Sequence, residues 1–210
     1  IFNKMRYKQS DLINIIIQHN PQIKSYLEIG TQMGYTFNKI NLTDKTGVDI
    51  VDQKEKFNFT ADHITTSQNF LHNINNRTYD IILCDGDRDG KTQSKDIIDS
   101  YNILNNNGYI IFPAVLPYDP IEQIVPRMSK GWTGDTWKYI QDIQYNKTFP
   151  IYLIHTNHNT LPYHLLISNN LPFQNTNGNP PMKDFLTVIH NTDEYFHTLT
   201  VDELINLMNK

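Results

Sequence analysis

The chain has 210 residues, a length that suits one domain with its own hydrophobic core. Its formal net charge is −4 at pH 7 and its basic residues are scattered, so a nucleic-acid partner is not expected. No apolar stretch has membrane-spanning length, and the first residues lack a signal-peptide core. Cys84 is the only cysteine, which excludes an internal disulfide and favours a reducing compartment, the cytoplasm.

Strand-like and helix-like segments alternate through about the first 115 residues. Short apolar runs predict strands at residues 23–30, 46–51, 57–60, 79–86 and 108–114. Apolar spacing and capping residues predict helices at 10–20 (capped by Ser10), 35–41, 67–74 (capped by Ser67) and 94–104. This alternation is typical of a parallel sheet that helices cover on both faces.

The second part of the chain is less regular. A proline-rich connector at 113–126 leads to a predicted helix at 135–143 and to strands at 151–156 and 163–168. Thr200 and Glu203 have capping-box spacing before a last helix. We therefore expect a doubly wound, Rossmann-like, mostly parallel α/β sheet over residues 1–174, with an antiparallel last strand. Residues 175–210 are expected to form a loop and a helical tail that pack on it.

A glycine turn follows the first predicted strand. "YLEIGTQMG" places Glu28 near the strand end and Gly30 and Gly34 across a turn that enters a helix. Glycine there lets backbone N–H groups approach a ligand, although packing alone also explains it. Asp49, 21 residues after Glu28, ends the second strand, where a carboxylate can accept the hydroxyl hydrogens of a ribose. Two acids beside this turn indicate a site for an adenosine-bearing ligand.

Several segments resemble class I S-adenosylmethionine-dependent methyltransferases. "LEIGTQMG" is similar to their first motif and "GVDI" to their ribose-binding segment. "TTSQNFL", "CDGDR" and "GWTGDTWKYI" are similar to segments of a small-molecule branch in which Asp-Gly-x-His follows the fourth strand. The likeness runs from about Tyr26 to Ile140, and it implies methyl transfer from S-adenosylmethionine to oxygen on a small molecule.

The resemblance also implies roles for single residues. Glu28 would lie near the methionine part of the cofactor, with Gly30 and Gly34 providing clearance. Asp49 would bind the ribose, and Thr66 and Ser67 would lie near the adenine. Asp85 would face either the amino acid part of the cofactor or the acceptor.

"DGDRDGKTQSKD", residues 85–96, also matches the spacing of a calcium-binding loop. An EF-hand loop follows a helix, however, whereas this one follows a predicted strand. Ligands of open α/β sheets bind at the carboxyl ends of strands, which explains Asp85 without calcium. We therefore expect no calcium site, and we expect the other acids to form a solvated turn that caps the next helix.

The chain departs from the branch at two places. Arg88 replaces the expected histidine, and Pro113–Ala114 replaces a His-Asp pair that ends the fifth strand. Proline and alanine can neither accept a proton nor bind a metal, so we predict no catalytic metal. Arg88 is predicted to hold an anionic group of the acceptor or to form an ordinary salt bridge. A base would then come from elsewhere in the chain, and the candidates are Asp87, Asp135, His155, His158 and His164.

Three functions remain open at this point. One is an active methyltransferase with Asp87, Arg88 and Asp135 as its candidate catalytic residues. Another is a relative that binds the cofactor without activity and serves as a binding or assembly module. The third, an unrelated nucleotide-binding enzyme, is disfavoured by the acid–glycine turn. Trp132 and Trp137 flank a carboxylate, which favours a sugar acceptor mildly, with core packing as the equal alternative.

Overall fold

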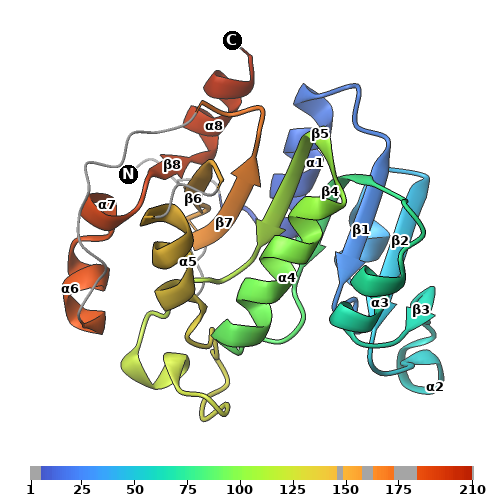
Figure 1. The fold of residues 1–210 in the computed structure, drawn as a ribbon, viewed down its shortest axis with the longest axis horizontal. Coiled ribbons are helices and arrows are strands. Elements are labelled where there is room, and N and C mark those ends of the chain that lie inside the picture. Colours follow the sequence, from blue (N-terminus) through green and yellow to red (C-terminus); the bar gives the residue numbers. More distant parts are fainter. Residues whose placement is uncertain (1–5, 146–148, 158–162, 173–183, 210) are drawn as a thin grey trace.

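The computed structural model describes residues 6–145, 149–157, 163–172 and 184–209. Within these ranges the strands form one eight-stranded sheet with the order β3-β2-β1-β4-β5-β7-β6-β8 (Figure 1). The strands are β1 (Ser25–Ile29), β2 (Asp44–Asp49), β3 (His63–Ile64), β4 (Tyr79–Cys84), β5 (Leu104–Phe112), β6 (Ile151–His155), β7 (Tyr163–Ser168) and β8 (Thr198–Thr200).

The first five strands run parallel to one another, and β7 is antiparallel to both β5 and β6. The carboxyl ends of β1, β4 and β5 therefore meet at one edge of the sheet, the lower edge in Figure 1. The predicted mostly parallel Rossmann-like sheet with an antiparallel strand near its end is confirmed. A further short strand, β8, pairs parallel with β6 and was not predicted.

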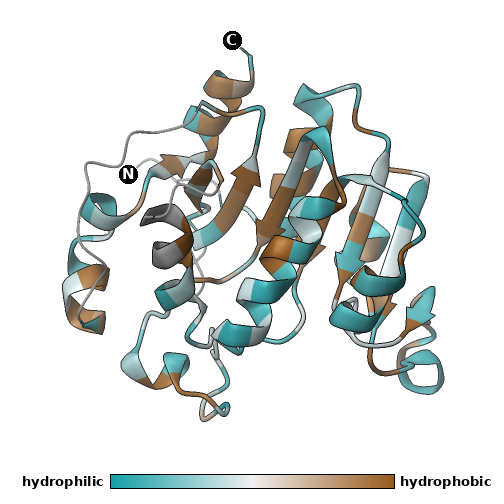
Figure 2. Ribbon diagram, in the orientation of Figure 1, coloured by the Kyte–Doolittle hydropathy of each residue, from teal (hydrophilic) through white to brown (hydrophobic). Residues whose placement is uncertain are grey.

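Helices cover both faces of the sheet. α3 (Ser67–Asn73), α4 (Gly90–Asn102) and α5 (Thr136–Tyr145) lie on the near face in Figure 1, and α1 (Gln9–His19) lies behind. The strands between them are hydrophobic (Figure 2), and one apolar cluster fills each face. Burial on both faces explains why these strands read as nearly continuous apolar runs. None of the described helices combines the length and apolarity needed to cross a bilayer.

Some predicted boundaries were wrong in the first half of the chain. The helix expected at 35–41 is only the 3-10 turn η1 (Phe37–Lys39), since so short a run barely supports a helical nucleus. The strand expected at 57–60 is absent, because Phe57 ends α2 (Lys54–Phe57) and Asn58 is left-handed with φ 52°. Short β3 takes its place beside β2.

Helix caps also differ from the predicted ones. Lys8, not Ser10, occupies the N-cap position of α1, and Ser10 is buried in the first turn. Thr66, not Ser67, caps α3 by accepting the Asn69 N–H. α4 begins at Gly90, four residues earlier than predicted, because Asp89 accepts the Thr92 N–H at 3.0 Å. The capping role predicted for the acidic loop is thus confirmed at Asp89.

The described residues 184–209 include three short helices, α6 (Phe185–His190), α7 (Thr192–Tyr195) and α8 (Val201–Met208). Thr200 and Glu203 form the predicted capping box, in which each side chain bonds to the backbone N–H of the other residue. α8 contacts α1 and β6, so this helix covers the same face as α1. The loop predicted at 175–181 lies outside the described residues.

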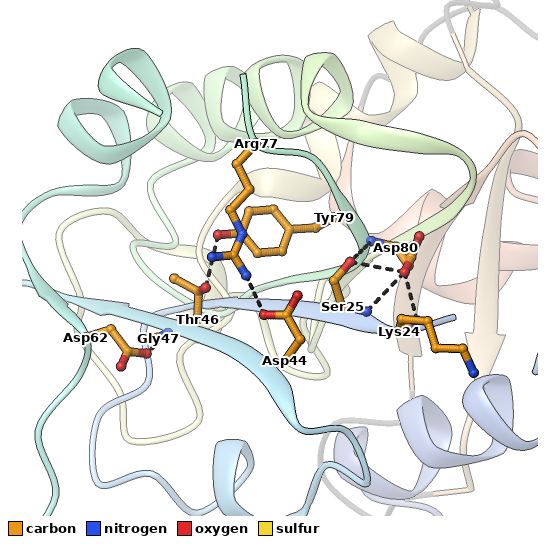
Figure 3. Close-up of polar contacts among 9 residues, drawn as sticks. All are labelled: Lys24, Ser25, Asp44, Thr46, Gly47, Asp62, Arg77, Tyr79 and Asp80. Atoms are coloured by element: carbon orange, nitrogen blue, oxygen red, sulfur yellow. Dashed lines mark hydrogen bonds and ion pairs between the residues drawn. The ribbon is translucent and has the colours of Figure 1, made fainter. Parts of the chain in front are cut away.

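Polar side chains fasten the amino ends of β1, β2 and β4 (Figure 3). The Asp80 carboxylate accepts the Lys24 N–H at 2.8 Å, the Ser25 N–H at 3.0 Å and the Ser25 hydroxyl at 3.0 Å. Beside it, Arg77 pairs with Asp44. Burial alone would raise the pKa of Asp80, but these hydrogen bonds, together with one from Asn105, outweigh it and hold that pKa below its ordinary value.

Candidate functional site

A cleft of about 660 Å³ lies at the carboxyl ends of β1, β2 and β4. This volume falls within the range of about 300–1,000 Å³ that is typical of small-molecule sites. Most of the predicted cofactor and catalytic residues line it, and these are Gly30, Asp49, Thr66, Ser67, Asp85 and Asp87. Glu28, Gly34, Arg88 and Asp135 do not line the cleft.

The two predicted glycines have different surroundings. Gly30 has φ 86°, and a Cβ there would lie 2.3 Å from the Asp85 carbonyl oxygen, so the ends of β1 and β4 approach closely. Gly34 has φ 75°, and its Cβ would lie 2.4 Å from the Phe59 ring. Gly30 therefore shapes the cleft, whereas Gly34 makes room for an aromatic side chain outside it.

Asp49 ends β2 next to the glycine turn, and its carboxylate faces backbone donors. Oδ2 accepts the Gln32 N–H at 2.6 Å and Oδ1 accepts the Val51 N–H at 3.0 Å. A carboxylate has about four lone-pair sites, so it can accept two further hydrogen bonds. Asp49 is thus held rigidly in the cleft wall with acceptor capacity to spare.

The opposite wall is the amino end of α3. Thr66 caps this helix, and the Ser67 hydroxyl donates to Asp96 Oδ1 at 3.0 Å. Asp96 belongs to α4, so this bond joins the two helices that border the cleft. Burial raises the pKa of Asp96 to about 6, although the bond from Ser67 acts in the opposite direction.

Glu28 is buried inside the sheet rather than exposed to the cleft. It pairs with Gly47 in register, so Asp49 lies two positions farther along the neighbouring strand. Its carboxyl accepts the Tyr26 hydroxyl at 2.6 Å. Burial raises the pKa of Glu28 to about 8; the Tyr26 bond opposes this and the charge of Asp85 adds to it. These surroundings favour the neutral form of Glu28.

Asp85 directly follows β4 and forms an ion pair with Arg88. Its Oδ1 accepts from Arg88 Nη2 at 2.6 Å and its Oδ2 from Gln9 Nε2 at 3.0 Å. Arg88 Nη1 donates to the carbonyl oxygens of Pro113 at 2.9 Å and Ala114 at 3.3 Å. Burial raises the pKa of Asp85 although the Arg88 charge acts against it. The ordinary salt bridge, one of the two predictions for Arg88, is present.

The departure at Pro113–Ala114 has a structural counterpart across the sheet. Ala114 has φ 55° and donates its N–H to His164 Nδ1 at 3.0 Å. Since Nδ1 accepts this bond, the neutral imidazole carries its proton on Nε2. The role of His164 in this geometry is structural, since it and Arg88 both bond to the backbone at the end of β5.

The acids of the 85–96 loop bind separate partners in the protein. Asp87 is exposed and accepts the Asp89 N–H at 3.1 Å, and Asp89 caps α4. Asp135, which directly precedes α5, accepts the Gly90 N–H at 2.8 Å and so stabilises the same helix end. Among the described residues no three His, Cys, Asp or Glu side chains are grouped to hold a metal ion.

The remaining predicted candidates lie away from the cleft. His155 packs its ring against Tyr163, with ring centres 4.9 Å apart, and His158 lies outside the described residues. Trp137 is buried and donates to Gln123 at 3.2 Å, and Trp132 donates to the Ile124 carbonyl at 2.8 Å. Both indoles therefore bond to the segment around η2 (Pro120–Gln123); Trp137 belongs to the core cluster, whereas Trp132 is only partly buried.

Two apolar residues of the cleft were missed by the sequence analysis. Ile50 and Val51 line it, and their side chains are 69% and 49% exposed. Exposed aliphatic side chains in a cleft wall are suited to cover a flat ring. Their position directly after Asp49 in "VDIV" was the available signal, because the residues that follow a strand tip line the same edge.

No family model and no curated protein sequence matches the chain. Solved structures do match. A protein described as a caffeoyl-CoA O-methyltransferase, from Staphylococcus aureus, shares 21% identity over 76% of this chain and 82% of its own, with a TM-score of 0.51. An amino pentose methyltransferase from Micromonospora echinaspora shares 11% identity over 76% of this chain and 89% of its own, with a TM-score of 0.56.

The fold is not confined to methyl transfer. A spermidine synthase matches 94% of this chain and 68% of its own at 14% identity, with a TM-score of 0.53. Likeness at these identities establishes architecture alone, because one fold supports many activities. The resemblance noted in the sequence motifs is confirmed at that level: the chain has the fold of the class I S-adenosylmethionine-dependent methyltransferases.

Proposed function

We propose that the chain is an S-adenosylmethionine-dependent methyltransferase that acts on oxygen of a small molecule, with a sugar as one acceptor that fits. The observation that carries this proposal is the cleft at the carboxyl ends of β1, β2 and β4, which brings Gly30, Asp49 and Ser67 together. In open α/β sheets, ligands bind at this position.

The cleft residues fit the parts of the cofactor. Asp49 retains two acceptor sites for ribose hydroxyls, and Ile50 and Val51 offer apolar surface to the adenine. Thr66 and Ser67 border the same space from α3. The bound cofactor would supply a methyl group activated on a sulfonium.

Methylation of a hydroxyl needs an oxygen held in line with that methyl group and a group that removes the hydroxyl proton. Besides Asp49, which is assigned to the ribose, the cleft is lined by the carboxylates of Asp85 and Asp87. Asp85 is the stronger candidate base because its pKa is raised by burial, and Arg88 and Gln9 fix its orientation. Asp135 supports the site from behind by bonding to the start of α4.

The alternative is a relative that binds the cofactor without turnover and serves as a binding or assembly module. The observation in its favour is the position of Arg88, whose guanidinium bonds to the carbonyls of Pro113 and Ala114, where the branch carries its His-Asp pair. In this alternative the ion pair with Asp85 closes the acceptor side of the site permanently.

Calorimetric titration with S-adenosylmethionine tests the proposal. The wild-type chain is expected to bind, and Asp49→Ala to lose at least about tenfold in affinity, because two hydrogen bonds to a charged acceptor are removed. Glu55→Gln is the matched control, since Glu55 is an exposed carboxylate on α2 outside the cleft. Asp49→Asn keeps one acceptor oxygen, so its affinity should lie between those of wild type and Asp49→Ala. Because it nearly preserves the shape of the side chain, it also controls for misfolding of the alanine variant.

The outcomes separate the two functions. Equal affinity of wild type and Asp49→Ala would refute the proposed cofactor site. Binding with methyl transfer to a panel of hydroxylated acceptors supports the methyltransferase. Binding of the cofactor with no transfer to any of them would favour the inactive relative.

A further inference from the structure

A second pocket, of about 320 Å³, lies beside the cofactor cleft on the α1 face of the sheet. We call it the lysine pocket; its lining is residues 7–10, Tyr35, Thr36, Lys39 and His164. The first segment leads into α1, and Tyr35 and Thr36 follow the glycine turn. No predicted cofactor residue lines this pocket, so it is available for another molecule.

The charge of the lysine pocket is opposite to that of the whole chain. Lys8 and Lys39 are its charged residues, and no Asp or Glu lines it, whereas the chain has a formal net charge of −4. Within the part of the chain that the structure describes, neither lysine forms an ion pair. Two ammonium groups without a carboxylate between them create a local positive potential that attracts anions.

One side chain separates the lysine pocket from the cofactor cleft. Gln9 lines the pocket, and its amide donates to Thr36 Oγ1 at 2.9 Å and to Asp85 Oδ2 at 3.0 Å. Asp85 lines the cleft on the other side. A molecule in the lysine pocket is therefore one side chain away from the carboxylate that we assign as the candidate base.

The wall next to β7 is rigid and polar. His164 lines the pocket and is only 5% exposed, and its Nδ1 accepts the Ala114 N–H. This bond fixes the orientation of the ring in the pocket wall. The side chains of Thr36 and Ser10 add hydroxyls, and Tyr7 and Tyr35 add aromatic surface.

We propose that the lysine pocket is the acceptor site of this chain and that its ligand is a small hydroxylated molecule with an anionic group, a phosphate or a carboxylate. Lys8 and Lys39 bind the anionic group, and the hydroxyl lies toward Gln9 and Asp85. The acceptor role rests on the proposed function, whereas the preference for anions rests on the charges of the pocket alone.

Titration of the full chain, without cofactor and at low salt, tests this preference. Inorganic phosphate serves as the free anion and glucose as the neutral sugar. Glucose 6-phosphate and glucuronate serve as sugars that carry a phosphate and a carboxylate. We expect the anionic sugars to bind at least about tenfold more tightly than glucose, since each ammonium gives a charge-assisted hydrogen bond. Lys8→Gln combined with Lys39→Gln should abolish that difference.

Lys24→Gln combined with Lys130→Gln is the matched control. It removes the same charge from exposed lysines outside the pocket, and Lys24 lies at the amino end of β1. Unchanged affinity for the anions in this control, with loss in the pocket variant, supports the proposal. Binding of glucose as tight as that of the anionic sugars, or no binding of any anion, would overturn it.

Failure of this inference can be distinguished from failure of the proposed function. Anion binding that survives Lys8→Gln with Lys39→Gln, in a chain whose cofactor affinity depends on Asp49, refutes the lysine pocket and leaves the function intact. Anion binding that requires both lysines, in a chain with no affinity for S-adenosylmethionine, refutes the function and supports the ligand class. A loss of cofactor affinity alone in the lysine variant would assign the lysines to the cofactor and overturn the proposal.

Discussion

The two ends of the central strands use charged side chains differently. At the amino end, Asp80 accepts hydrogen bonds from the first residues of β1 and from Asn105, and its pKa is lowered. At the carboxyl end, Glu28 and Asp85 lie in surroundings that raise their pKa values, with burial as the largest cause in both. The surroundings at the amino end stabilise the ionised form of the carboxyl group, whereas those at the carboxyl end destabilise it.

This difference separates stability from function within one sheet. A carboxylate whose pKa is lowered adds to the free energy of unfolding at neutral pH, whereas one whose pKa is raised subtracts from it. Acids kept at a cost in stability are candidates for chemistry or binding. Substitutions at the two ends of the sheet should therefore differ in which property they change, stability or function.

Gly30→Ala should destabilise the chain most, by about 4 kcal/mol, at the carboxyl end. The new Cβ would meet the Asp85 backbone at 2.3 Å, and a non-glycine residue would be forced to φ 86°. Gly86→Ala is the matched control, since its Cβ would lie 3.6 Å from Ile29, an ordinary contact. Urea unfolding measures both, and similar values would show that the close approach of β1 and β4 is not required.

Arg88→Met should cost about 2–3 kcal/mol of unfolding free energy. It leaves the Asp85 carboxylate, 17% exposed, without its ion pair, and it removes the donor to Pro113 and Ala114. Adding Asp85→Asn should recover part of this loss, because the unpaired charge is then gone. Additive effects of the two substitutions, measured by urea unfolding, would contradict the coupling that the geometry implies.

Asp80→Ala should cost about 1–2 kcal/mol and leave the affinity for S-adenosylmethionine unchanged. The Ser25 N–H and hydroxyl lose their acceptor at the amino end, far along the strands from the cleft. Because the folded pKa of Asp80 is lowered, its contribution is present above the ordinary carboxyl pKa and disappears as pH falls through the folded value. The variant should therefore lose less stability than wild type on acidification. An altered affinity for S-adenosylmethionine would contradict the idea that the amino end of the sheet serves stability alone.

The sequence predicted the part of the fold that depends on periodicity. Apolar runs identified β1, β4 and β5, and the acid that ends β2 was placed next to the glycine turn. The prediction was wrong where tertiary contacts determine the secondary structure. Asn105 was predicted to lie in a turn, but it belongs to β5, where its side-chain amide donates to Asp80. Local preferences are overridden in this way when a neighbouring strand supplies the missing partner.

The candidate site was predicted in outline for a similar reason. Residue type and strand position locate Asp49 and Asp85, but they do not determine which groups a side chain bonds to. Whether Arg88 binds an anion or a protein carboxylate depends on the backbone carbonyls at Pro113 and Ala114, which no motif encodes. The lysine pocket is a stronger example, since its lysines come from segments about 30 residues apart that meet through tertiary contacts such as the hydrogen bond from Gln9 to Thr36.

Arg77→Met should have the smallest effect, less than about 1 kcal/mol. Arg77 pairs with Asp44 as Arg88 pairs with Asp85, but these two side chains are 46% and 55% exposed, and water already screens the pair. Raising the salt concentration should remove most of the difference between this variant and wild type, whereas the Arg88→Met effect should persist. If the two arginines proved equally costly in urea unfolding, burial would not be what distinguishes the ends of the sheet. Both are arginine–aspartate pairs near strand ends, and they differ in access to solvent and in one further contact each: Arg88 also donates to the Pro113 and Ala114 carbonyls, whereas Arg77 lies over the Tyr79 ring.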